Sequence, residues 1–187
     1  MRVPVSILGS KTIQTFSSIG RISIFIHRFF YWIFKPPFRI RLIVDQLYFI
    51  GNKSVFIILL SGGFTGMVLA YQTYFGFKLI NIDSLVGPVV ALSMARELAP
   101  VLAGLIVSGR AGGAMAAEIG TMKVTEQIDA LEVMGINSFQ YLAVPRIIAG
   151  TIALPLLSVL FLLIGNVGGW FVGTKALMID ESLYFAK

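Results

Sequence analysis

Between Lys53 and Lys78 the chain reads SVFIILLSGGFTGMVLAYQTYFGF, residues 54–77, without a single charged side chain. A helix needs roughly 20 predominantly apolar residues to cross the hydrocarbon core of a bilayer. Hydrocarbon offers no hydrogen bonds, so a segment that crosses it must pair its own backbone groups, and a helix does this. The stretch therefore predicts a transmembrane helix.

Two more stretches have the same character. Residues 84–109 are apolar except for Arg96 and Glu97 near the middle, and residues 147–174 contain no charge. Both exceed the length that a membrane span requires. The sequence therefore predicts an all-α integral membrane protein with three transmembrane helices in this chain.

The composition agrees with a membrane environment. Of 187 residues, 57% are hydrophobic and 13% are charged, and the mean hydropathy is +0.87. Soluble proteins carry about 25% charged residues, and a chain of this size exposes a large surface when folded. Too few charges are present to cover that surface against water. Cysteine is absent, which excludes disulfides and thiolate metal ligands.

The positive charge is concentrated before the first span. The net charge is +6, and eight of the fifteen Lys and Arg residues lie in the first 53 positions. A basic flank beside sparse loops is typical of the cytoplasmic side of a membrane protein, next to anionic lipid. We therefore expect no nucleic-acid partner. The N-terminus and residues 110–146 are expected on the cytoplasmic or stromal side, and Lys187 on the opposite side.

Residues 22–34, ISIFIHRFFYWIF, are dense in aromatic side chains. His27 and Arg28 interrupt them, so the segment is too short and too charged to span and is expected to lie as an interfacial helix among the headgroups. Pro36 and Pro37 should end it, and amphipathic residues 38–49 would lead into the first span. Two roles stay open here: an aromatic anchor, or an elbow that positions a neighbouring subunit.

Arg96 and Glu97 are the charged residues inside a predicted span. Charges at membrane depth are costly and usually face a protein interior or a wet cavity. Adjacent residues on a helix do not face each other, so this pair cannot simply neutralise itself. An ion pair that locks helices together is one interpretation, and a polar lining of a substrate path is the one we favour. Pro100 predicts a kink just beyond them.

Glycines recur at helical spacing along the chain. Small residues four apart let membrane helices approach each other backbone to backbone. Packing inside the bundle, and at a seam between subunits, is the role that we expect for them. The glycines concerned are Gly62, Gly66, Gly109, Gly113, Gly165, Gly169 and Gly173.

In residues 120–135, GTMKVTEQIDALEVMG, hydrophobicity falls and charge returns. The apolar residues share one helical face and the acids lie on others. Thr125 is expected to cap the start of a helix, Glu126 suits its positive end, and Gly135 can end it. The segment predicts a short amphipathic cytoplasmic helix between two spans. From the residues alone, an ordinary loop helix is the favoured interpretation.

Signatures of catalysis are absent from the sequence. His27 is the single histidine, and neither Gly-x-Ser-x-Gly nor His-Glu-x-x-His occurs. Residues 168–175, GGWFVGTK, approach a P-loop, but Thr and Lys stand in reverse order inside a span, where the strand–loop–helix cradle cannot form. We therefore expect no enzyme activity and neither a metal nor a cofactor in this chain.

Three blocks of sequence together resemble a known family. They are residues 64–72 (FTGMVLAYQ), residues 96–102 (RELAPVL) with Gly109 and Arg110, and residues 117–135 (AEIGTMKVTEQIDALEVMG), extended by VPR at 144–146. Over residues 38–175 the chain is similar to the MlaE/YrbE permeases. These are the membrane subunits of ABC transporters that move phospholipids between membranes.

The resemblance implies a dimer of permeases, two cytoplasmic ATPase subunits that carry the ATP, and a substrate-binding protein with an MCE domain on the opposite face. It implies a bacterial inner membrane or a plastid membrane, and a phospholipid as the transported molecule. Arg96 and Glu97 would lie near the lipid cavity. The connector would be a coupling helix seated on the ATPase through Glu126, Gln127, Ile128, Asp129, Leu131 and Glu132.

On this basis residues 1–52 form an N-terminal interfacial or elbow region, and residues 53–187 form a permease transmembrane domain. Members of the family normally have five spans, and residues 179–187 look like the opening of another element. We therefore expect the chain to be incomplete. The alternative function is a secondary transporter or channel subunit in which Arg96 and Glu97 form an intramembrane relay.

Overall fold

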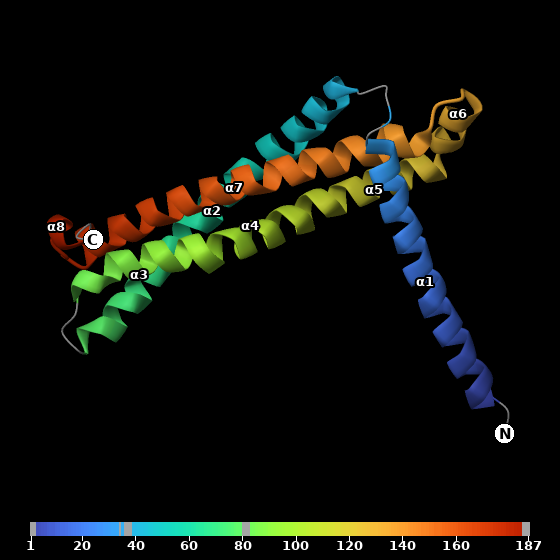
Figure 1. Cartoon of the computed structure of the whole chain (residues 1–187). Helices are drawn as coiled ribbons and strands as arrows, with labels where there is room; N and C mark the ends of the chain where they lie inside the picture. Colours follow the sequence, from blue (N-terminus) through green and yellow to red (C-terminus); the bar gives the residue numbers. More distant parts are fainter. Residues whose placement is uncertain (1–2, 34, 36–38, 80–82, 185–187) are drawn as a thin grey trace.

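The computed structural model describes residues 3–33, 35, 39–79 and 83–184, and their helices are joined by short connections (Figure 1). Three helices are long and apolar enough to cross a membrane: Ile40–Lys78, Val86–Val124 and Phe139–Ala176. The predicted all-α membrane architecture with three spans is confirmed. The expected break at Pro36 and Pro37 and the position of Lys187 lie outside the described residues.

The spans are built from several helical segments, some of them π-helical. The first span is one α-helix, the second is three α-helices joined by two π-helical turns, and the third is an α-helix with a π-helical turn at each end. The α-helices are α1 Val3–Ile33, α2 Ile40–Lys78, α3 Val86–Ser93, α4 Ala99–Val107, α5 Gly113–Val124, α6 Gln127–Val133, α7 Val144–Phe171 and α8 Glu181–Tyr184. The π-helical turns are Met94–Leu98, Ser108–Gly112, Phe139–Ala143 and Val172–Ala176, and a 3-10 turn covers Asp83–Leu85.

One predicted boundary was wrong. The helix of the second span does not end at Gly109 but continues to Val124, because the small residues that follow include helix-favouring alanines and no proline. The amphipathic residues before the first span lead into it, since from Ile40 onward they belong to the same helix α2. Gly51 alone does not end that helix, because an isolated glycine is tolerated inside a helical pattern.

The N-terminal helix α1 is longer than the predicted 22–34, since it begins at Val3. Its first half is rich in Ser, Thr and Gly, which obscured the helical pattern. Hydroxyl groups bond back to the helix, as when Thr12 Oγ1 donates to the Gly9 carbonyl at 2.8 Å. Contact with the spans comes through the C-terminal half, where the rings of Phe25 and Phe139 meet edge to face at 5.0 Å. Figure 1 shows α1 leaving the bundle at a steep angle.

The core of the fold is the contact between α2 and α7. Each helix buries a row of residues about four apart, and both rows contain glycines. A Cβ added to Gly62 would lie 3.0 Å from the Phe161 carbonyl oxygen, and one added to Gly66 would overlap the Gly165 backbone. The two backbones therefore touch directly, which only glycine permits. Gly62, Gly66 and Gly165 lie where the predicted packing role requires.

The second span covers this contact with a row of buried residues. Along α3 the row steps by four residues and reaches Met94, whose side chain packs on Gly165. The next buried position is Ala99, five residues on, and this longer step falls within the π-helical turn Met94–Leu98. A π-helical turn accommodates one extra residue. The buried row is Val86, Val90, Met94, Ala99, Ala103, Val107 and Ala111.

The C-terminal end of α7 is closed by Tyr184 of α8, at the end of the bundle opposite α6 (Figure 1). A Cβ at Gly173 would lie 2.6 Å from the Tyr184 ring, and one at Gly169 would lie 3.1 Å from its hydroxyl oxygen. These two glycines therefore make room for an aromatic ring. Burial raises the pKa of Tyr184 from 10.0 to about 12, because the phenolate would lose its hydration.

The glycine contact predicts a large difference between two substitutions in the same helix. Gly66→Ala places a methyl group on the Gly165 backbone, and overpacking of this kind costs about 1–3 kcal/mol. Gly76→Ala has open space around it, with nothing within 4 Å. We expect a lower midpoint of thermal unfolding in detergent for the first and an unchanged one for the second. Equal midpoints would contradict direct backbone contact.

Candidate functional site

The connector between the second and third spans is a short helix, α6, reached by a sharp reversal. Thr125 was expected to cap α6 but instead closes α5, because its Oγ1 donates to the Thr121 carbonyl at 2.8 Å. Glu126 precedes α6 with a left-handed backbone, φ 58°. A side chain in this region costs roughly 1 kcal/mol relative to glycine. The prediction of the helix was right, and the predicted cap was wrong.

Gly135 ends α6 as predicted. Its φ is +74°, its N–H donates to the Glu132 carbonyl at 3.0 Å, and the Ile136 N–H donates to the Leu131 carbonyl at 3.0 Å. This pair of hydrogen bonds is the Schellman motif, in which glycine takes the left-handed position at no steric cost. The chain then turns directly into the third span.

The six residues predicted for a coupling helix point in different directions. Glu126 and Gln127 are exposed, whereas Ile128 and Leu131 are half-buried. Asp129 pairs with Lys123 at 3.2 Å across the reversal. Glu132 turns the other way and accepts a hydrogen bond from Ser138 Oγ at 2.7 Å. Of the six residues, only Ile128 and Leu131 are turned partly away from the exposed surface.

Apolar side chains that were not predicted as part of the site are exposed on the connector. They are Val124, 84% exposed, Val133, 89% exposed, and Met134, 65% exposed. Val133 and Met134 lie outside the three candidate spans, and Val124 is the last residue of the second. Exposed apolar groups of this kind are typical of a protein-binding surface. The sequence does contain an indication of this surface, because Val124, Val133 and Met134 are apolar residues within a segment of charged ones.

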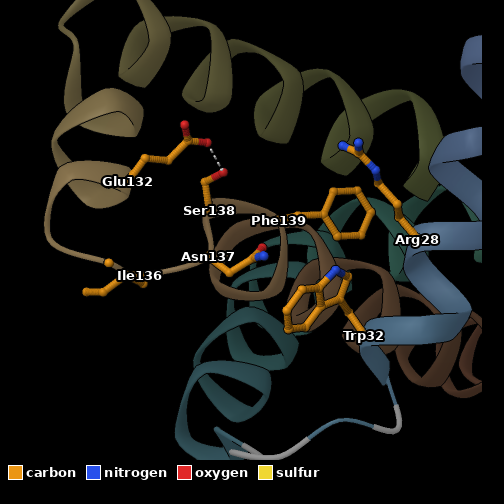
Figure 2. Close-up of a pocket in the computed structure, with 8 residues that line it drawn as sticks. Arg28, Trp32, Glu132, Ile136, Asn137, Ser138 and Phe139 are labelled. Atoms are coloured by element: carbon orange, nitrogen blue, oxygen red, sulfur yellow. Dashed lines mark hydrogen bonds between the residues drawn. The ribbon is translucent and has the colours of Figure 1, made fainter.

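A pocket of about 650 Å³ separates α6 from α1, with Arg28 and Trp32 on the α1 side. Figure 2 shows Glu132 and Arg28 entering it from opposite walls, with Asn137 and Phe139 between them. Sequence reasoning missed this pocket, since 104 positions separate Arg28 from Glu132. We refer to it below as the elbow pocket.

Two arginines tie the second span to its neighbours close to the connector. Arg146 at the start of α7 is buried and pairs with Glu118 of α5, Nη2 to Oε2 at 2.9 Å. Arg110 donates from Nη1 to the buried Ser54 Oγ at 2.9 Å. These contacts hold the long helix Val86–Val124 against both other spans. Both arginines belong to the stretches that resemble the MlaE/YrbE permeases, but the spacing of residues did not indicate which side chains they would contact.

Arg96 and Glu97 lie together on the π-helical turn of the second span, and both are exposed. Within the described part of the chain neither forms an ion pair. Beside them an open groove of about 410 Å³ is lined by α2 residues and by Leu98. The α2 residues are Phe64, Thr65, Val68, Leu69 and Gln72.

Gly109 and Gly113 do not pack in this chain, since a Cβ added to either would meet nothing within 4 Å. Their predicted packing role within the bundle is therefore not met by any described residue. In the ranges described, no cluster of three His, Asp or Glu side chains occurs.

The comparisons with known proteins match this architecture. The family model described as Permease MlaE matches residues 43–187. The chain belongs to the MlaE permease family. A probable ABC transporter permease protein of Rickettsia bellii is 45% identical over 180 residues, covering 96% of this chain and 70% of the relative.

Two further relatives carry more specific names. The intermembrane phospholipid transport system permease protein MlaE of Haemophilus influenzae is 41% identical over 184 residues, 97% of this chain and 70% of that protein. Protein TRIGALACTOSYLDIACYLGLYCEROL 1, chloroplastic, of Arabidopsis thaliana is 40% identical over 133 residues, 71% of this chain and 38% of that protein. As an MlaE-family member, the chain is a membrane permease.

The buried ion pair predicts that two similar substitutions differ in effect. Glu118→Gln leaves the Arg146 charge buried without its partner and should lower stability by about 1–3 kcal/mol, since half of the Glu118 side chain is exposed. Asp129→Asn removes an exposed pair and should cost less than about 1 kcal/mol. Chemical denaturation in detergent measures both. A larger loss for Asp129→Asn would argue against the assigned roles.

Proposed function

We propose that this chain is the permease subunit of an ABC transporter that moves phospholipids between membranes, driven by ATP hydrolysis on a separate subunit. The observation that carries the proposal is the attachment of α6 to two spans. Thr125 and Glu126 join it to the second span, and a Schellman turn leads from it into the third. A force on α6 would therefore be transmitted to both.

The surface proposed for the ATPase is the outer side of the connector. The connector exposes the acidic and amide groups of Glu126 and Gln127 at the start of α6, and the apolar Val133 and Met134 at its end. An interface of this kind combines an apolar centre with a polar rim. The basic N-terminal region lies at the same end of the bundle as α6 (Figure 1), and the positive-inside rule favours the cytoplasmic or stromal side for both.

The proposed lipid path runs along the groove between α2 and the π-helical turn. Its wall offers Phe64, Val68 and Leu69 to acyl chains, while Thr65 and Gln72 add polar groups. Arg96 and Glu97 stand next to Leu98, where a zwitterionic headgroup could be paired. The family resemblance supports a second permease copy, and we place it across this open face. It also supports an MCE-domain protein at the end that carries α8.

The relatives support two locations for the complex. One is a bacterial inner membrane, and the other is a plastid membrane, since one relative is named chloroplastic. ATP would be bound on the partner ATPase in either case. This chain would contribute the membrane path and the coupling surface, without covalent chemistry of its own.

Charge reversal on the connector tests the coupling surface. The double variant Glu126→Lys, Asp129→Lys should reduce copurification of the ATPase subunit by at least about tenfold, because interface charges of the wrong sign repel. The spans should keep their thermal midpoint. Glu181→Lys, on α8 at the opposite end, is the matched control. Undiminished copurification of the double variant would count against the proposed docking surface.

Neutralising the charges of the π-helical turn tests the lipid path. Arg96→Gln and Glu97→Gln should each lower ATP-dependent phospholipid movement in proteoliposomes by about an order of magnitude, the value of one charge-assisted contact. ATPase copurification should be unchanged. Gly104→Ala, in the same span with nothing within 4 Å, is the control. Lipid movement that needs no ATPase and follows a proton gradient would favour the secondary-transporter alternative.

A further inference from the structure

We propose that the elbow pocket binds the headgroup of a membrane phospholipid that carries both a phosphate and a primary ammonium. The lipid would be a component of the surrounding membrane leaflet, held between α1 and the connector. This inference goes beyond the transport proposal and does not depend on it. The volume of about 650 Å³ is within the range of small-molecule sites.

One side of the pocket supplies positive charge. Arg28 lines it, and an adjoining hollow that shares Trp32 and Asn137 is lined by Lys35 and Arg39. Within the described ranges these three cations form no ion pair with a carboxylate. Aromatic rings hold two of them in place, since Lys35 Nζ lies 4.8 Å from the Trp32 ring and Arg39 lies 4.9 Å from the Tyr141 ring. Positioned cations of this kind suit a phosphate.

The opposite side supplies a single negative charge. Glu132 projects from α6 toward the pocket, and Ser138 Oγ donates to its Oε1 at 2.7 Å (Figure 2). That hydrogen bond fixes the carboxylate and leaves its second oxygen for another donor. A primary ammonium can donate to it, whereas a quaternary ammonium cannot. A second anion would be repelled. The two walls therefore match a zwitterion with a hydrogen-bonding amine.

The surroundings favour a lipid over a protein segment as the occupant. The α1 wall continues into exposed apolar residues, and the pocket itself contains the rings of Trp32 and Phe139. Trp side chains concentrate at headgroup depth in membrane proteins, because the indole ring is largely apolar but carries a polar N–H. Exposed side chains on α1 include Phe16, Ile19, Ile22, Phe25, Ile26 and Phe30.

A lipid at this position would contact both α1 and the segment that ends α6. Gln140, at the start of the third span, already donates from its Nε2 to the carbonyl of Lys35, just after α1, at 2.8 Å. The bound headgroup would add a further link, from Arg28 to Glu132. The orientation of the connector would then depend on the lipid composition of the membrane.

Fluorescence of Trp32 can report binding, since the chain contains two tryptophans and Trp170→Phe leaves Trp32 alone. The full chain in detergent is titrated with mixed micelles of phosphatidylethanolamine, phosphatidylglycerol or phosphatidylcholine, and separately with soluble O-phosphoethanolamine. We expect phosphatidylethanolamine to bind at least about tenfold more tightly than the other two lipids, as one charge-assisted hydrogen bond provides. O-phosphoethanolamine should bind more weakly, because it lacks the apolar tails.

Three variants assign the contacts. Arg28→Gln should weaken all three lipids by about tenfold, whereas Arg21→Gln, on the same helix and outside the pocket, should change nothing. Glu132→Gln keeps an oxygen for Ser138 but removes the charge. It should weaken phosphatidylethanolamine and strengthen phosphatidylglycerol, so that the preference disappears.

Several results would overturn the proposal. Equal binding of the three lipids, or a preference that survives Glu132→Gln, would remove the zwitterion site. Binding of O-phosphoethanolamine without binding of the lipid would assign the pocket to a soluble ligand. Loss of ATPase copurification in Arg28→Gln, with lipid binding intact, would assign the pocket to the ATPase.

Discussion

Helices α2 and α7 touch through their backbones, and the positions of the other elements follow from that contact. Gly66 and Gly165 carry no side chain to separate the helices, and Met94 from the second span fills the space left above Gly165. In a membrane no hydrophobic effect drives helices together, so close packing must supply the association. The contact also fixes the rotation of α2, which turns Phe64 and Val68 toward the open groove.

The second span is fitted to this contact by its π-helical turn. One additional residue between Met94 and Ala99 keeps the buried row continuous on both sides of the turn. The same turn leaves Arg96 and Glu97 exposed on the surface of this chain. π-Helical turns occur often at functional positions. The exposure of these two charged side chains and the irregular backbone therefore have the same origin, the additional residue in the π-helical turn.

The sequence predicted what depends on hydrophobic length and helical period. The three spans, a packing role for Gly62, Gly66 and Gly165, and the end of α6 at Gly135 could be deduced because each rests on a local pattern, although the pairing of α2 with α7 could not. Contacts between side chains that are distant in the sequence could not be predicted in this way. Nothing in the spacing indicated that Arg146 would meet Glu118, or that Glu132 would turn toward α1. The cap at Thr125 failed because the same hydroxyl can close the helix before it or open the one after it.

The second span and the start of the connector form one rod. From Arg96 to Val124 a helix rises by about 1.5 Å per residue, roughly 40 Å in all. Arg110, bonded to Ser54 on α2, lies 14 residues from each of these two ends. The Glu118–Arg146 pair holds the same rod between that bond and the connector, and the buried row from Met94 to Ala111 holds it on the other side. A rod fixed at several points along its length would move as a whole, so a displacement of the connector would be carried to Arg96.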